Sequence, residues 1–311
     1  MQPVIEVTNL SKAYKNLKAV DGLSFTVHAG DVYGFLGQNG AGKSTTIRML
    51  LTLIQPTGGD IRMFGLTLND HRNKILRNVG AVIEKPDVYK YLSAYNNLKL
   101  FARMSGIHPA EKELMTQLDR VGLKDRANDK VHTYSQGMKQ RLGIAIALVH
   151  NPQLIILDEP TNGLDPQGIA DIRNLILHLS HELHKTLLIS SHLLSEMEQV
   201  ATRLLIIDKG KKLVEGAATD LFDPTQTLVE LQTLDNESAR SFIKNSVWQT
   251  ALQPRRNNHI LIKMHRDKIP AFHVWLVQQN IQLISLQPRH SLEDYFLQIT
   301  SGQQHVAAFT N

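Results

Sequence analysis

The chain has 311 residues, a formal net charge of +5 and no cysteine. Its length suffices for one large domain and one small one. It lacks the run of roughly 18 apolar residues that crosses a membrane, and its first residues lack the basic and apolar regions of a signal peptide. The absence of cysteine fits a reducing compartment. The mild positive charge fits proximity to an anionic membrane or a nucleic acid, and it fits an ordinary soluble protein equally well.

The residue pattern of the N-terminal region predicts an antiparallel hairpin followed by a buried strand. Residues 3–8 and 22–28 alternate between apolar and polar side chains, which is typical of an antiparallel hairpin with one buried face. Residues 32–36 form a short, mostly apolar run, which predicts a buried strand.

Residues 37–44 fit the pattern G-x-x-x-x-G-K-[ST], which predicts a loop that binds the phosphates of a nucleoside triphosphate. Glycines let the backbone pass close to the phosphates, and the N–H groups of the loop and of the helix expected at residues 44–53 form an anion site. Lys43 would place its charge near the β- and γ-phosphates, and the Ser44 hydroxyl would bind Mg²⁺. A chance glycine-rich turn is the alternative, which the strand–loop–helix context disfavours. The residues expected to contact the nucleotide here are Gly37, Asn39, Gly40, Gly42, Lys43, Ser44 and Thr45.

A helical subdomain is expected at about residues 86–150, inserted into a core formed by residues 1–83 and 152–218. Within it, Tyr91 and Tyr95 would be neighbours if their segment is helical. Ser135, in the sequence Ser-Gln-Gly, stands where an N-cap belongs before an apolar helix. A helix that starts with Ser-x-Gly can bind an anion, and an ordinary capped helix is the alternative.

A second apolar run, at residues 154–157, ends in Asp158 and Glu159. Because the run is short and contains β-branched residues, it predicts a central parallel strand. Acids at the carboxyl end of such a strand lie beside the ligand crevice. Asp158 could then hold Mg²⁺, and Glu159 could orient or deprotonate an attacking water. A strand that runs into an acidic surface turn is the alternative.

A composition shift near residue 216 predicts a domain boundary, with a nucleotide-binding domain at residues 1–218 and an accessory α+β domain at residues 219–311. Lys209 and Gly210 predict a hairpin turn between two strands. No catalytic motif follows the boundary, and Arg255 with Arg256 indicates a charged turn. The strands expected around and beyond the boundary are residues 203–208, 211–215, 226–232, 259–264 and 281–285, and the helices are residues 237–244, 269–279 and 291–299.

The order of these motifs resembles that of the ATP-binding cassette (ABC) ATPases. The order comprises the phosphate loop, the Ser-x-Gly segment, the acidic strand end, Gly-Leu-Asp-Pro at residues 163–166 and Ser-Ser-His at residues 190–192. Five ordered motifs are far more specific than one, and they cover residues 1 to about 218. The resemblance implies an α/β fold with a P-loop (RecA-like) core, an antiparallel β layer and an inserted helical subdomain. It also implies hydrolysis of ATP with Mg²⁺.

The resemblance also assigns roles to individual residues. It implies that Tyr14 stacks on adenine and that His192 touches the γ-phosphate, although both could be purely structural. Ser135 and Gly137 would contact the γ-phosphate held by the opposite subunit. Asp165 would link the two sites across the dimer.

The chain departs from the family's pattern at two points. Its signature reads Tyr-Ser-Gln-Gly-Met rather than Leu-Ser-Gly-Gly-Gln, which resembles an exporter-type variant. After the strand expected at residues 79–83, Glu84 stands where the family usually has a glutamine that contacts Mg²⁺ and senses the membrane subunits. A carboxylate binds Mg²⁺ more strongly than an amide does. Glutamate there resembles the subgroup that exports bacitracin and lantibiotic-like peptides or confers immunity to them, and a tolerated substitution is the alternative.

Together these features predict the ATP-hydrolysing subunit of an ABC transporter that exports a peptide antibiotic or another amphipathic compound, with Lys43, Glu159 and His192 as catalytic residues. We expect a head-to-tail dimer with a second copy or a homologous ATPase subunit, at the cytoplasmic face of the membrane. Separate transmembrane permease subunits would dock near the tyrosines that follow Glu84, and ordinary packing within the helical subdomain is the alternative role for these tyrosines. A soluble ABC ATPase acting on nucleic acid or ribosomes is one alternative, disfavoured by the single cassette, so no nucleic acid is expected. A P-loop kinase is another, and it leaves the Ser-x-Gly segment and His192 unexplained.

Overall fold

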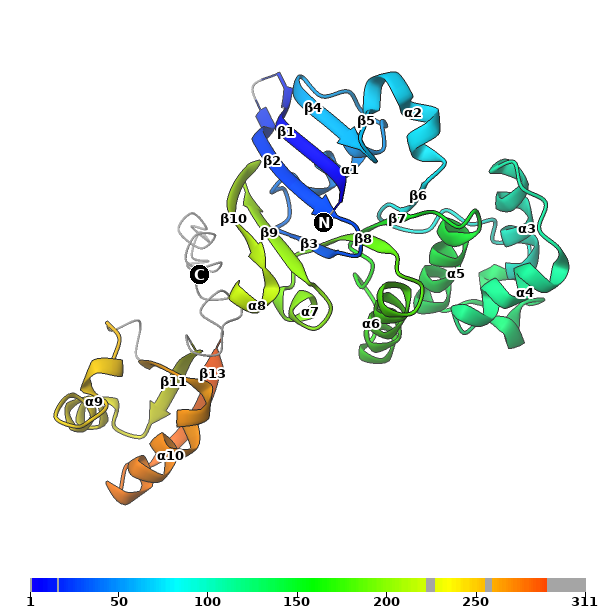
Figure 1. Ribbon diagram of the computed structural model, residues 1–311. Helices are drawn as coiled ribbons and strands as arrows, with labels where there is room; N and C mark the ends of the chain where they lie inside the picture. Colours follow the sequence, from blue (N-terminus) through cyan, green and yellow to red (C-terminus); the bar gives the residue numbers. More distant parts are fainter. Residues whose placement is uncertain (1, 16, 222–226, 255–258, 290–311) are drawn as a thin grey trace, which may run out of the picture. The chain divides into compact units, whose positions relative to one another are not determined.

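The computed structural model describes residues 2–15, 17–221, 227–254 and 259–289, and it divides into two compact units (Figure 1). The first unit spans Met1–Ala218 and the second spans Thr219–Asn311. No helix among the described residues is both long enough and apolar enough to cross a membrane.

The first unit begins with an antiparallel sheet in the order β2-β1-β4-β5. The predicted hairpin is present, and its two strands are longer than expected. Its inward side chains, such as Leu23, Phe25 and Val27, are buried at alternate positions, as one covered face requires. The strands are β1 (Pro3–Tyr14), β2 (Leu17–His28), β4 (Gly58–Met63) and β5 (Leu66–Thr67).

A second sheet of six strands forms the centre of the same unit, in the order β10-β9-β3-β8-β7-β6. Every residue of β3, β7 and β8 is buried, as expected for central parallel strands covered on both faces. Because these strands are parallel, their carboxyl ends meet at one edge of the sheet. The strands are β3 (Val32–Leu36), β6 (Val79–Val82), β7 (Leu154–Asp158), β8 (Thr186–Ser191), β9 (Arg203–Asp208) and β10 (Lys211–Ala217).

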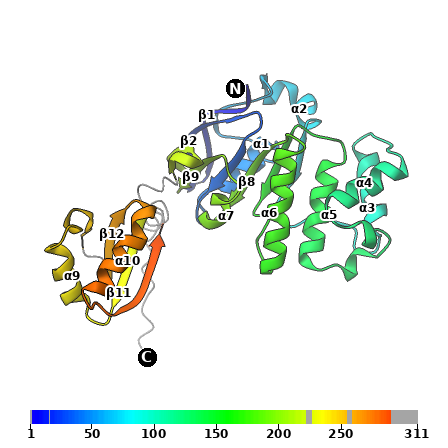
Figure 2. The same ribbon diagram turned by 60° about the horizontal axis from the view of Figure 1, so that its bottom comes forward.

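Helices flank this sheet, and α5 and α6 lie side by side in both views (Figure 2). The helix after the phosphate loop ends at Leu50, about one turn before the predicted end. The helices of the core are α1 (Lys43–Leu50), α2 (Leu68–Leu76), α6 (Pro166–His181) and α7 (Leu194–Glu198), and the short α8 (Ala218–Leu221) follows β10.

The helices α3 (Ala94–Met104), α4 (Glu111–Arg120) and α5 (Gln136–Leu148) lie between β6 and β7 in the chain. Short 3₁₀ turns at Lys124–Arg126 and Val131–Thr133 connect α4 to α5. The expectation that Tyr91 and Tyr95 are helical neighbours is wrong. Ser93 caps α3, accepting a hydrogen bond from the N–H of Asn96, so the helix starts after Tyr91.

The second unit has an antiparallel sheet in the order β12-β11-β13 with its own apolar core. Val229, Ile243 and Phe272 are fully buried in that core. The expected helix at residues 291–299, the expected turn at Arg255 and Arg256, and the first residue of the strand expected at residues 226–232 lie outside the described residues. The elements are β11 (Thr227–Thr233), α9 (Asn236–Lys244), η4 (Gln249–Ala251), β12 (Ile260–Met264), η5 (Arg266–Lys268), α10 (Ile269–Gln278) and β13 (Leu283–Arg289).

Candidate nucleotide-binding and catalytic site

The loop between β3 and α1 follows a path that only glycine permits at several positions. Gly40 and Gly42 have φ values of 84° and 107°, in the left-handed region that favours glycine. A Cβ on Gly42 would lie 2.5 Å from the carbonyl oxygen of Ala19. The loop leads directly into the N-terminus of α1, whose free N–H groups and dipole attract anions. The local backbone is therefore shaped to bind phosphate.

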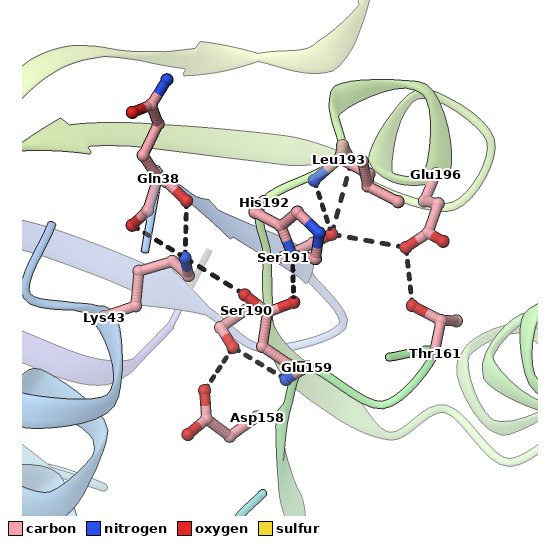
Figure 3. Close-up of polar contacts among 11 residues, drawn as sticks. Gln38, Lys43, Asp158, Glu159, Thr161, Ser190, Ser191, His192, Leu193 and Glu196 are labelled. Atoms are coloured by element: carbon pink, nitrogen blue, oxygen red, sulfur yellow. Dashed lines mark hydrogen bonds and ion pairs between the residues drawn. The ribbon is translucent and has the colours of Figure 1, made fainter. Parts of the chain in front are cut away.

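The ammonium group of Lys43 is enclosed at the centre of the site (Figure 3). Its side chain is only 5% exposed. Nζ donates to the carbonyl oxygens of Gly37 and Gln38 at 2.5 and 3.2 Å, and it lies 3.1 Å from Oε1 of Glu159. Phosphate oxygens entering the loop would offer this buried cation a stronger charged partner than the two carbonyl groups.

The parallel register of β7 and β8 places Ser190 opposite Asp158. The Ser190 hydroxyl donates to Oδ1 of Asp158 at 2.5 Å and accepts from the backbone N–H of Glu159 at 2.9 Å. The sequence did not predict these two hydrogen bonds of Ser190, although a serine at the end of an apolar strand indicates a possible polar contact at that edge of the sheet. Asp158 is 1% exposed, and within the described residues its Oδ2 has no hydrogen-bond partner. A buried, unsatisfied carboxylate oxygen at this position fits Mg²⁺, with the Ser44 hydroxyl at the start of α1 as a second donor.

The carboxylate of Glu159 is held on both sides. Oε1 faces Lys43, and Oε2 lies 2.7 Å from Nδ1 of His192, which follows β8. Since a carboxylate only accepts, Nδ1 of His192 carries the proton. The structure thus brings the three predicted catalytic residues together at the carboxyl ends of β7 and β8. A carboxylate positioned in this way can orient a water molecule and accept its proton.

A further contact, which the sequence did not predict, joins the segments that follow β7 and β8. Oε2 of Glu196, on α7, accepts from the Thr161 hydroxyl at 2.6 Å and from the Ser191 hydroxyl at 3.3 Å. Ser191 in turn accepts from the N–H of Leu193 at 3.0 Å. Thr161 lies two residues after Glu159, and Ser191 directly precedes His192. Glu196 therefore ties together the two segments that carry the catalytic pair (Figure 3).

Glu84, the third expected metal ligand, has a different partner. It follows β6 with a φ of 57°. Its carboxylate forms an ion pair with Arg48 of α1, and the Glu84 side chain is 61% exposed. An arginine partner offsets part of the negative charge that a carboxylate adds near the phosphates. Contact between Glu84 and Mg²⁺ stays a prediction.

The other predicted nucleotide contacts come from separate elements. Tyr14 ends β1, is 46% exposed and has the Lys12 ammonium 5.0 Å from its ring centroid. At the start of α5, the Ser135 hydroxyl accepts from the N–H of Met138 at 3.2 Å, so the helix cap is present. Asp165 caps α6, because its Oδ1 accepts a hydrogen bond from the backbone N–H of Gly168 at 3.1 Å. Adenine stacking by Tyr14 and phosphate contact by Ser135 and Gly137 stay predictions.

Comparison with known proteins places this geometry in a family. A family profile described as ABC transporter matches residues 20–162. The chain is 41% identical over 303 residues to a bacitracin transport ATP-binding protein of Bacillus licheniformis, covering 97% of this chain and 99% of that protein. It is 40% identical over 228 residues to a lantibiotic transport ATP-binding protein of Streptococcus pyogenes, covering 73% of this chain and 95% of that protein.

A solved structure agrees with these sequence matches. The dimeric structure of an ATP-binding cassette in a post-hydrolysis state, bound to ADP and Pi, matches with a TM-score of 0.62 and 26% identity. The match covers 69% of this chain and 98% of that chain. The α/β fold of a P-loop ABC cassette, expected from the sequence, is confirmed.

Proposed function

We propose, from the premise that this chain belongs to the ABC transporter family, that it is the motor subunit of an exporter of peptide antibiotics. The chain is an ABC ATPase that binds ATP with Mg²⁺. Its relatives are ATP-binding subunits of transporters, so it works with membrane permease subunits and as a dimer. The single observation that supports the motor role is the Glu159 carboxylate, bracketed by Lys43 and His192 at the sheet edge beside the phosphate loop.

Hydrolysis would begin when phosphate oxygens replace the loop carbonyls as partners of Lys43. As Lys43 turns to the phosphates, its contact with Oε1 of Glu159 weakens, and the carboxylate is free to orient a water molecule and take its proton. His192 can turn its proton from Glu159 towards the γ-phosphate. Asp158 and Ser44 would hold Mg²⁺, which neutralises charge on the phosphates.

The partner in the dimer would supply the rest of the site. Ser135 and Gly137 of a second copy, or of a homologous subunit, would close over the nucleotide in a head-to-tail arrangement. Closure depends on ATP because ATP and ADP bind the closed and open states with different affinity. Permease subunits would convert this movement into transport.

Relatives support a peptide antibiotic as the exported substrate. The bacitracin relative matches almost the full chain, whereas the lantibiotic relative matches a stretch only slightly longer than the first unit. We therefore favour a bacitracin-type substrate over a lantibiotic. Both relatives are named for the compound that is transported, and neither name refers to a nucleic acid. Action on a nucleic acid is therefore disfavoured. The chain would lie at the cytoplasmic face of the membrane, where ATP is available.

The test is resistance in cells. The chain is expressed with its permease subunits in a bacitracin-sensitive host, alongside the Glu159→Gln variant, and inhibitory concentrations of bacitracin and of a lantibiotic are measured. We expect resistance to bacitracin with the wild type and none with the variant. Active ATPase without resistance to either compound would contradict the antibiotic-export proposal and leave the ATPase assignment standing.

A further inference from the structure

A cleft of about 660 Å³ lies in the first unit between α4 and the end of α5, away from the catalytic cluster. Its lining residues fall within residues 107–120 and 148–151 and include Lys112, Arg120 and His150. Lys185 stands at its edge, where Nζ donates to Oδ1 of Asn151, a lining residue, at 2.8 Å. We call these four basic residues and the space between them the cationic cleft. Its volume lies within the range of about 300–1,000 Å³ typical of small-molecule sites.

The positive charges of the cationic cleft lack carboxylate partners. Among the described residues, no acid lies within ion-pairing distance of Lys112, Arg120 or Lys185. The one acid that lines the cleft, Glu113, accepts a hydrogen bond from the N–H of Ala110 at 2.8 Å and so caps its own helix. Arg120 donates only to the neutral amide of Gln117, at 3.0 Å. By contrast, Lys124, four residues after Arg120, forms an ion pair with Asp119 at 3.3 Å.

The basic groups also lie close enough to repel one another. Partial burial, and then the positive charge of Arg120, lower the pKa of Lys185. Burial lowers the pKa of His150, the hydrogen bond to the Val79 carbonyl opposes this, and the charge of Lys185 lowers it further. An anion between Arg120 and Lys185 would offset the repulsion between their positive charges.

The cationic cleft lies at the opposite edge of the central sheet from the catalytic residues. Asn151 lies just before β7, and Lys185 directly precedes β8, whereas Glu159 and His192 follow the carboxyl ends of the same strands. The two strands have five and six residues. At about 3.3 Å per residue, the two sites lie roughly 15–20 Å apart. A ligand in the cleft is therefore not the ATP that undergoes hydrolysis.

We propose that the cationic cleft is a second anion site, which binds the phosphate group of a small phosphorylated compound or of a lipid headgroup. Arg120 and Lys185 supply the charge, with Arg120 suited to two-point contact with phosphate oxygens. Lys112 and His150 line the remaining wall. This inference does not rest on the antibiotic-export proposal, because it concerns a different part of the chain and a different ligand.

The first test measures phosphate binding when the catalytic site is already filled. The full chain is saturated with Mg²⁺ and a non-hydrolysable ATP analogue, so that the phosphate loop cannot bind the probe, and inorganic phosphate is titrated in a calorimeter. Wild type should bind additional phosphate. The double variant Arg120→Gln, Lys185→Gln should bind it at least about tenfold more weakly, since two charge-assisted contacts are lost. The control Lys124→Gln removes a nearby cation that is already paired and should bind as wild type does.

The second test uses the wild-type chain and therefore does not depend on the folding of a variant. The lowered pKa of Lys185 leaves more of its amine free to react with an acylating reagent, and mass spectrometry measures the modification. Lys124 serves as the internal reference. One arm adds inorganic phosphate, a second adds phosphatidylglycerol vesicles, and a third adds neutral phosphatidylcholine vesicles.

Protection of Lys185 by phosphate identifies a soluble phosphorylated compound as the ligand type. Protection by phosphatidylglycerol vesicles alone identifies a lipid headgroup. Two results would overturn the proposal. One is the absence of both phosphate binding and selective protection in the phosphate and phosphatidylglycerol arms. The other is measurable phosphate binding that has the same affinity in the wild type and the double variant.

Discussion

Individual side chains determine how tightly the catalytic carboxylate is positioned. Glu159 is 16% exposed, and each of its carboxylate oxygens has a nitrogen partner: Oε1 lies 3.1 Å from Nζ of Lys43, and Oε2 lies 2.7 Å from Nδ1 of His192. These contacts fix its orientation before a nucleotide arrives, which reduces the reorganisation needed in the reaction. Both contacts must also change when phosphate enters, because Lys43 and His192 are the donors expected to bind the γ-phosphate. The same two residues therefore link nucleotide binding to activation of the base.

Replacing Lys43 by alanine tests the phosphate loop at this scale. Removing the enclosed ammonium group deletes the main charge beside the β- and γ-phosphates. ATP turnover should fall by roughly a hundredfold or more, and ATP binding should weaken strongly. The control is Lys124→Ala, which removes a lysine that is 55% exposed and lies outside the loop. A folded Lys43→Ala variant with normal turnover would refute the assignment of residues 37–44 as the phosphate loop.

Glu84→Gln tests the residue that departs from the family's pattern. An amide keeps one oxygen ligand but no charge, so ATP affinity should stay within about a few-fold while half-maximal ATPase activity needs more Mg²⁺. Export should fall more than basal ATPase activity. The control Arg48→Gln removes the ion-pair partner and keeps Glu84. A shift in Mg²⁺ dependence in Glu84→Gln but not in Arg48→Gln would indicate contact with the metal rather than a role of the ion pair. Unchanged Mg²⁺ dependence together with unchanged export in Glu84→Gln would mean that the substitution is simply tolerated.

The elements determine which residues can meet. Most strands were predictable because β3, β7 and β8 are short apolar runs, and their parallel pairing places the phosphate loop, Glu159 and His192 at one edge. The Ser190–Asp158 hydrogen bond depends on the register of β7 against β8, which apolar composition does not specify. The pairing of Glu84 with Arg48 depends likewise on where the fold brings the segment after β6 near α1, which local composition does not specify.

The contact between α7 and the segment after β7 gives a prediction at the scale of elements. Thr161→Val removes the hydroxyl that donates to Glu196 and keeps the side-chain volume. We expect kcat to fall about tenfold with little change in ATP affinity, because one hydrogen bond that positions the catalytic segment is lost. Thr161→Ser restores the donor and should recover most of the activity. Equal loss in both variants would indicate a packing role for the threonine methyl group instead.

At the scale of the whole chain, nucleotide chemistry and the C-terminal region belong to separate compact units. Every residue assigned to nucleotide or metal lies within Met1–Ala218, and Thr219–Asn311 has its own core around Val229 and Phe272. The sequence predicted the two regions from a composition shift and the end of the motifs. It could not predict what the second unit does, since its described surface carries no recognisable catalytic pattern.

Removal of residues 219–311 tests this independence. The remaining chain retains both sheets of the first unit and all predicted nucleotide contacts, so ATP binding should stay close to that of the full chain. Fluorescent nucleotide binding and circular dichroism on the purified truncation provide the measurement. A folded truncation that fails to bind ATP would show that the second unit completes the nucleotide site.

The central claim, that Glu159 is the base of an ABC ATPase working as a dimer, is tested most directly by Glu159→Gln. An amide keeps the shape of the side chain but cannot accept the proton of water, so hydrolysis should fall by about a hundredfold or more while ATP still binds. ATP bound but not hydrolysed should hold two copies together, and size-exclusion chromatography with light scattering should show a dimer with ATP and a monomer without it. Glu182→Gln, a surface substitution on the same unit, is the control. Hydrolysis at the wild-type rate by Glu159→Gln would contradict the account.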